Sequence, residues 1–158
     1  MERLAELYLQ RAENELIAAQ ILFEVSRNQA LQKEFRLEKD FTFYSSVIGH
    51  SYYCIFNCAK AMLIAEGIRT YPPDIHKRTY EAFEAHLVNT GKLDVQLLSI
   101  YRKSIIQAEE LLEIYGKEKE KRGEFTYQKL PQANVEPAEK SLERASFFFK
   151  NINAILRG

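Results

Sequence analysis

An arginine and a histidine lie close together in the chain at Arg69 and His76, and these residue types could act on a phosphate ester. Histidine can take or donate a proton near neutral pH, at a ribose hydroxyl or at a leaving oxygen. Arginine can hold the phosphate through two parallel hydrogen bonds. The pair straddles Pro72 and Pro73, which places it in a loop. The alternative, favoured because such a pair in a loop is common by chance, is that His76 orders a helix start and Arg69 is a solvated charge.

A second candidate site is a helix face that carries Tyr53, Asn57 and Lys60 at intervals of three or four residues. Such a face offers an aromatic surface for a base and a cation for a phosphate. Tyr52 lies about 100° around the same helix. We therefore expect Tyr52 in the core, with its hydroxyl bonded at the edge of the bundle. A structural or dimer-forming role for the Tyr53 face is the alternative, and we favour it.

The segment before the last predicted helix contains Arg122 and Tyr127, which could bind a nucleotide or RNA. The segment would flank the groove of a dimer and touch RNA, with Tyr127 as the stacking surface. The alternating charges of residues 117–122 favour a second interpretation. In that interpretation the segment is a solvated connection that begins at Gly116.

A row of possible metal ligands, His50, Cys54 and Cys58, repeats every four residues. Three ligands from one straight helix converge poorly, and a closed zinc site usually needs four. Small packed thiols are a commoner outcome for cysteines on an apolar helix. We therefore predict reduced cysteines, no metal site and no cofactor.

Helical periodicity accounts for nearly all of the chain, and no segment shows the alternation typical of a strand. The predicted helices cover residues 2–30, 41–66, 74–91, 94–115 and 134–158. The fourth is expected to turn one stripe inward, made of Leu97, Tyr101, Ile105, Ala108, Leu112 and Tyr115. We predict a single all-α domain over residues 1–158, an antiparallel four-helix up-and-down bundle with an additional short helix.

Charge and composition exclude several classes of protein. The chain has 22 basic and 22 acidic residues, so no overall field draws it to nucleic acid or to an anionic membrane. The longest apolar stretch contains His50, Asn57 and Lys60, which favours a buried helix over a membrane span. The charged N-terminus lacks a secretory signal, so we expect a cytoplasmic protein.

The central helix carries the sequence SYYCIFNCAKAML from Ser51 to Leu63. This segment resembles the tyrosine-pair, phenylalanine and alanine-lysine-alanine pattern of HEPN domains, which are often encoded beside small nucleotidyltransferases. Further landmarks agree in order along nearly the whole chain: Arg11, Ala12, Glu13, Gly67, His76, Phe83, Arg122, Phe125, Tyr127, Ala145 and Phe149. Two departures are the cysteines at 54 and 58, where small residues such as alanine are usual, and His50, where arginine is frequent.

The resemblance implies a helical bundle that forms a homodimer and acts in toxin–antitoxin modules or in nucleotide binding. Ribonuclease members carry an arginine, four to six residues and then a histidine. Arg69 and His76 fit this count with six intervening residues, whereas Arg78 and His86 are one residue too far apart. The usual motif, however, sits later, near the start of a following helix.

Our preferred hypothesis is a homodimeric interaction module that binds a nucleotidyltransferase-type partner and a nucleotide without catalysing a reaction alone. The alternative is a metal-independent, RNA-cleaving toxin in which His76 is the acid or base and Arg69 binds phosphate. The phenylalanines at 147, 148 and 149 exceed what one helical stripe can bury, which motivates the dimer.

Overall fold

The computed structural model describes the backbone of residues 1–122 and 134–158 and the side chains of residues 1–112 and 134–158. Throughout these ranges the secondary structure is helical, without a strand. The elements are α1 (Arg3–Arg27), α2 (Gln29–Glu34), α3 (Tyr44–Ala65), α4 (Ile75–Phe83), the π-helical turn η1 (Glu84–Val88), α5 (Val95–Arg122) and α6 (Val135–Arg157). The predicted all-α class is confirmed.

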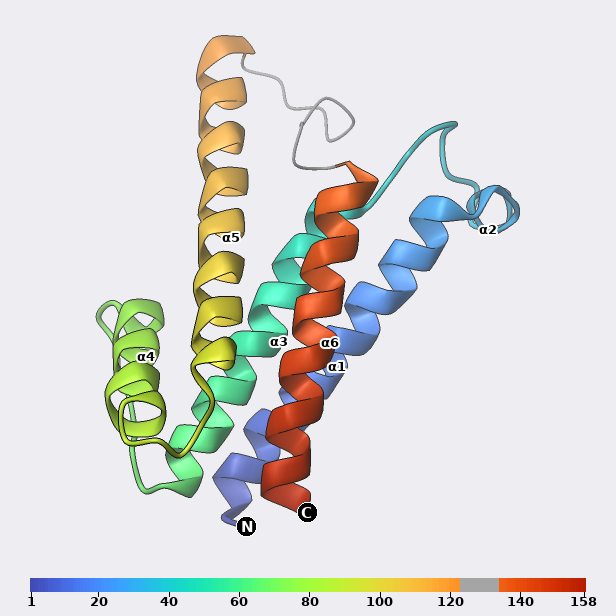
Figure 1. The fold of residues 1–158 in the computed structure, drawn as a ribbon. Helices are drawn as coiled ribbons and strands as arrows, with labels where there is room; N and C mark the ends of the chain where they lie inside the picture. Colours follow the sequence, from blue (N-terminus) through green and yellow to red (C-terminus); the bar gives the residue numbers. More distant parts are fainter. Residues whose placement is uncertain (123–133) are drawn as a thin grey trace.

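The helix α3 is the element against which the others pack. It contacts α1, α4, α5 and α6. Figure 1 shows α1 and α5 running in one direction and α3 and α6 in the other, with α4 beside the lower half of α5. Both chain ends lie at the same end of the molecule (Figure 1).

The sequence of α3 explains its central position, because apolar residues occur on all its faces rather than on one stripe. Every residue from Ser51 to Ile64 is buried except Tyr53. Although α3 is strongly apolar, none of the described helices is both long and apolar enough to cross a membrane.

The main hydrophobic core collects side chains from five of the helices. Its largest fully buried members include Leu9, Ile55, Phe83, Tyr101 and Phe148, which come from α1, α3, α4, α5 and α6 respectively. Phe83, Tyr101 and Phe148 pack ring against ring, with centroids 5.5 to 5.9 Å apart. A smaller cluster towards the other end contains Ala19, Phe23, Val47, Ile48, Leu111 and Ala138.

Two glycines end helices where the sequence predicts. Gly67 and Gly91 have positive φ angles of 78° and 81°, a conformation that is costly for residues with a Cβ. After Gly67 the chain turns back, and the amide of Ile68 donates to the carbonyl of Leu63 at 2.9 Å. The loop that follows brings the start of α4 back alongside α3, which is where the candidate site forms.

The structure corrects several predicted boundaries. The fourth helix does not stop at Gly116 but continues as α5 to Arg122, so the charged residues 117–122 are helical and do not form the expected loop. The polar interruption after the first helix contains the short helix α2. Asp74 and Asn134 stand at the expected N-cap positions, yet neither side chain makes a capping hydrogen bond.

Candidate functional site

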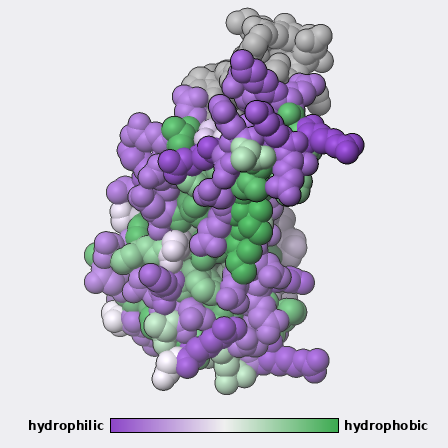
Figure 2. Space-filling model, turned by 90° about the vertical axis from the view of Figure 1, so that its right-hand side faces the viewer, coloured by the Kyte–Doolittle hydropathy of each residue, from purple (hydrophilic) through white to green (hydrophobic). Residues whose placement is uncertain are grey.

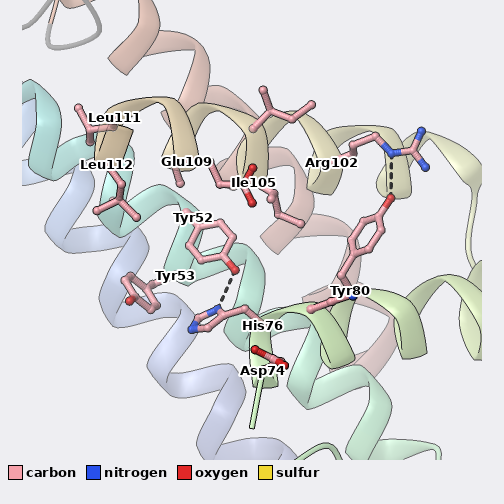
Figure 3. Close-up of a pocket in the computed structure, with 14 residues that line it drawn as sticks. Tyr52, Tyr53, Asp74, His76, Tyr80, Arg102, Ile105, Glu109, Leu111 and Leu112 are labelled. Atoms are coloured by element: carbon pink, nitrogen blue, oxygen red, sulfur yellow. Dashed lines mark hydrogen bonds between the residues drawn. The ribbon is translucent and has the colours of Figure 1, made fainter. Parts of the chain in front are cut away.

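A cleft of about 650 Å³ opens between α3, the first two turns of α4 and one side of α5 (Figure 3). Its walls are mainly apolar and come from Tyr52, Tyr53, Ile105, Ile106, Ala108, Leu111 and Leu112. Polar groups reach it from Asp74, His76, Lys77, Tyr80, Arg102 and Glu109. The cleft has the size and the composition of small-molecule sites, which are mostly apolar and contain a few polar groups that orient the ligand.

His76 is fixed against an aromatic wall by three rings of α3. The Phe56 ring lies 4.4 Å from the imidazole, centroid to centroid, and the Tyr52 and Tyr53 rings lie at 5.6 and 5.9 Å. The hydroxyl of Tyr52 is 2.7 Å from Nδ1 of His76 (Figure 3). The prediction that Tyr52 is buried with its hydroxyl bonded at the edge of the bundle is confirmed.

The protonation states of this pair follow from their surroundings. Burial raises the pKa of the Tyr52 hydroxyl, and Tyr53 and the Glu109 carboxylate raise it further, so it keeps its proton. Burial also lowers the pKa of His76, which favours the neutral imidazole. Since Nδ1 is the partner found for this hydroxyl within the described residues, we infer that Tyr52 donates and Nδ1 accepts. The remaining proton of His76 then sits on Nε2, which makes that nitrogen a donor.

The rim of the cleft carries balanced charges. Arg102 on α5 donates through Nε to the hydroxyl of Tyr80 at 2.9 Å and pairs with Glu84 at 3.8 Å. Its guanidinium therefore links α5 to α4 and η1 across the mouth. Lys77 is the second cation, and Asp74 and Glu109 are the acids.

The two proposed catalytic residues have separate surroundings. Arg69 donates through Nη2 to the carboxylate of Glu2 at 2.6 Å, which ties the loop after α3 to the start of α1. It does not line the cleft, whereas His76 does. The structure therefore gives His76 a cleft and gives Arg69 an exposed ion pair outside it.

Lys60 has a structural contact that the sequence did not reveal. Only 4% of the residue is exposed, and Nζ donates to the carbonyl and hydroxyl oxygens of Thr70 at 3.0 and 3.1 Å. The Thr70 hydroxyl lies 2.7 Å from that of Thr79 on α4, and the Lys60 ammonium lies 5.3 Å from the centre of the Tyr8 ring. Burial lowers the pKa of Lys60, and the charge of Arg69 lowers it further. Lys60 thus holds the α3–α4 loop in place.

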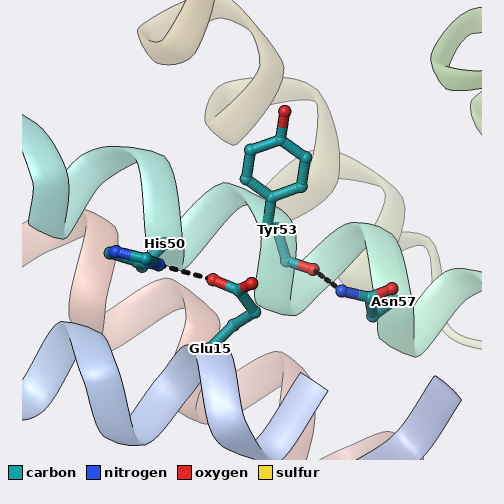
Figure 4. A network of polar contacts seen from close by, with 4 residues as sticks. All are labelled: Glu15, His50, Tyr53 and Asn57. Atoms are coloured by element: carbon teal, nitrogen blue, oxygen red, sulfur yellow. Dashed lines mark hydrogen bonds and ion pairs between the residues drawn. The ribbon is translucent and has the colours of Figure 1, made fainter. Parts of the chain in front are cut away.

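The predicted face of Tyr53, Asn57 and Lys60 does not form one pocket. Tyr53 lines the cleft, whereas Asn57 is buried and donates to the carbonyl of Tyr53 at 2.9 Å within its own helix (Figure 4). His50 pairs with Glu15 of α1 at 2.5 Å, as Figure 4 also shows. Of Tyr53, Asn57 and Lys60, only Tyr53 lines the cleft.

The remaining candidates lie away from the cleft or outside the described part. Cys54 and Cys58 are free and fully buried, and burial raises the pKa of the Cys58 thiol. Within the residues that the structure describes, no group of three or more histidine, cysteine or acidic side chains is placed to hold a metal. The side chain of Arg122 and all of Tyr127 lie outside the described residues.

The sequence did not predict the wall of the cleft that α5 forms, because the periodicity placed Leu112 on the inward face of that helix. Leu112 was expected in the inward stripe, yet it is strongly exposed and lines the cleft, while Leu111 is buried in the smaller core cluster. An apolar residue at both 111 and 112 was the available signal, since one helix stripe cannot bury two successive side chains.

Comparisons of the chain with models of protein families, with curated proteins and with solved structures found no significant match.

Replacing Lys60 by methionine should destabilise the fold. Methionine keeps the apolar stem but removes the donor to Thr70, and losing a hydrogen bond to a charged group typically costs about 1.5–3 kcal/mol. The matched control is Lys92→Met, which breaks the exposed ion pair with Glu66 and should cost less than about 1 kcal/mol. Urea unfolding measures both, and equal losses would contradict the structural role of Lys60.

The stability of the protein should decrease in mild acid through His76. Because the folded state lowers the pKa of His76 below the ordinary 6.5, the unfolded chain binds the proton more readily as pH falls from 7 to 5. The slope should stay well below about 1.4 kcal/mol per pH unit, the limit for one proton, because the ring is partly exposed. Urea unfolding at each pH would test this, with His76→Asn expected to flatten the dependence. An unchanged slope in that variant would assign it to other groups.

Proposed function

We propose that this protein is a binding module whose cleft receives a planar heteroaromatic ligand, such as the base of a nucleotide. The observation that supports this is the combination of an exposed ring, Tyr53, with an oriented imidazole, His76, in one apolar cleft. Every nucleobase has a face that can stack on an aromatic ring. The Nε2 proton inferred for His76 would give such a base one hydrogen bond.

The charges of the rim determine which part of a nucleotide, the base or the phosphates, should contribute most to its affinity for the cleft. Two cations, Lys77 and Arg102, stand against two acids, Asp74 and Glu109, so the formal charge of the lining is 2 − 2 = 0 when His76 is neutral. Arg102 is moreover engaged with Tyr80 and Glu84. We therefore expect the base to supply most of the affinity, and each added phosphate to contribute little.

The resemblance to HEPN domains extends this proposal to the assembly. In the extended proposal, the long helices α1, α3, α5 and α6 form an antiparallel up-and-down bundle, and α4 is the additional short helix. The alternating directions of the four long helices support this arrangement. The module is a cytoplasmic homodimer that binds a nucleotidyltransferase-type partner in a toxin–antitoxin system. The aromatic pair of the resembling segment, Tyr52 and Tyr53, lies at the cleft, which supports a ligand-binding role for that segment.

A second candidate function is metal-independent cleavage of RNA, which the position of His76 favours. A neutral imidazole beside a cleft is suited to accept a proton from a ribose hydroxyl. The placement of Arg69 speaks against it, because the guanidinium pairs with Glu2 and does not line the same cleft. Binding without cleavage therefore remains the preferred function.

Nucleotide binding can be tested by calorimetric titration of adenosine, AMP and ATP, with the guanine and uracil series beside them. We expect a dissociation constant that changes less than about tenfold, or 1.4 kcal/mol, from nucleoside to triphosphate. Tyr53→Ala should weaken binding about fivefold to a hundredfold, the effect of losing one stacking side chain worth about 1–3 kcal/mol. The matched control is Tyr71→Ala, which removes an exposed tyrosine outside the cleft. No binding by the wild type, or equal losses in both variants, would refute the proposal.

Cleavage can be tested on cellular RNA in the presence of a chelator, with wild type, His76→Ala and Arg69→Ala compared after each is shown to fold. We expect intact RNA in all three samples. Cleavage by the wild type that is lost in both variants would instead establish the ribonuclease function. Loss in His76→Ala alone would place the chemistry in the cleft without Arg69.

A further inference from the structure

The outer face of α1 carries exposed aliphatic side chains that no other described element covers. Leu7, Ile17 and Ile21 are 42%, 45% and 57% exposed, although each is large and apolar. Figure 2, which views the molecule from the right-hand side of Figure 1, shows a narrow vertical band of apolar side chains between hydrophilic ones. Isolated exposed leucines are ordinary, so the spacing of these residues decides whether they form a surface.

The spacing is that of a coiled-coil seam. Together with Gln10 and Asn14, which are also exposed, these residues occupy positions 7, 10, 14, 17 and 21, an alternation of three and four residues. This alternation is the heptad repeat that keeps one stripe of a helix facing a partner helix. The opposite face of α1 is already used, since Leu9, Ala12 and Leu16 are buried in the main core. The seam is thus additional to the packing within the chain.

We infer that this seam, residues 7, 10, 14, 17 and 21 of α1, is where a second copy of the chain docks, with the two α1 helices parallel. In that register each side chain meets its own counterpart, so leucine and isoleucine face their like and the two Asn14 amides can bond to each other. A single asparagine at such a position is known to fix register in parallel dimers at some cost in stability. The inference rests on the homodimer proposed above and names its surface.

Charge at the border of the seam favours this arrangement. In the parallel register, Glu6 of one copy lies beside Arg11 of the other, because flanking residues five apart face each other across a parallel coiled coil. Arg11 is exposed, and its guanidinium rests over the Tyr8 ring at 5.3 Å. Glu6 also pairs with Arg157 of its own copy at 2.6 Å, so its carboxylate is shared between Arg157 and the Arg11 of the second copy. Two such contacts form, one on each side of the two-fold axis.

The available area sets the expected strength. The seam runs from Leu7 to Ile21 and therefore spans about 22 Å at about 1.5 Å per residue. A contact of that length and of one helix width, about 12 Å, buries on the order of 500 Å² over both partners, which is the size of a weak, transient interface. We therefore expect a reversible dimer with a dissociation constant in the high micromolar range.

The test is sedimentation equilibrium from about 10 µM to about 1 mM, a range that brackets the affinity expected of so small an interface. The wild type should approach twice the 18.4 kDa chain mass, and Ile17→Glu should remain a monomer. The matched control, Val95→Glu, places the same charge on α5 at a valine that is 68% exposed and should still dimerise. A monomeric wild type, or a dimer that survives Ile17→Glu, overturns the inference.

A cysteine introduced into the seam tests the parallel register directly. Asn14→Cys should form a disulfide-linked dimer under mild oxidation, because the two side chains meet at the two-fold axis. Ser99→Cys, on an exposed part of α5, should not, and the native cysteines are buried. Absence of a cross-link in Asn14→Cys contradicts the register. Nucleotide titration of Ile17→Glu separates the two proposals, since the cleft lies on other helices and its binding should persist in the monomer.

Discussion

The burial of α3 is the constraint on which the rest of the structure depends. A helix that is apolar on every face gains free energy only when it is surrounded, so α1, α4, α5 and α6 each contribute one side of its enclosure. The same constraint explains the polar groups inside it. The buried ammonium of Lys60 keeps its charge satisfied by reaching the loop that follows its own helix. Enclosing α3 therefore also fixes the loop and the start of α4.

The cleft is the place where this enclosure is incomplete. From Ser51 to Ile64 only Tyr53 is exposed, and that residue stands where α4 and α5 separate. The aromatic rings of α3 continue out of the core there and meet His76, which the Thr70–Thr79 contact positions through the first turns of α4. The site is thus an extension of the core to the surface.

The sequence predicted what depends on local pattern and missed what depends on the placement of distant residues. Periodicity identified the long helices, and Gly67 and Gly91 ended two of them because positive φ is a local requirement. It could not show that Arg69 meets Glu2, since that contact joins residues far apart in the chain. The prediction that Lys60 belongs to a binding face was wrong for a related reason. A lysine on a helix suggests an exposed charge, and the loop whose oxygens accept its hydrogen bonds is evident only in the structure.

Two of the surfaces that remain open on the described residues lie on different helices and have different chemistry. The cleft combines rings, an imidazole and balanced charges, a composition that small-molecule sites share and that supports the ligand binding we propose. The seam of α1 is a row of aliphatic and amide side chains at heptad spacing, which selects another helix. The cleft is lined by residues of α3, α4 and α5 and of the turn before α4, whereas the seam lies on α1. Docking on one surface therefore leaves the other accessible. The ligand binding and the assembly that we propose can therefore change independently.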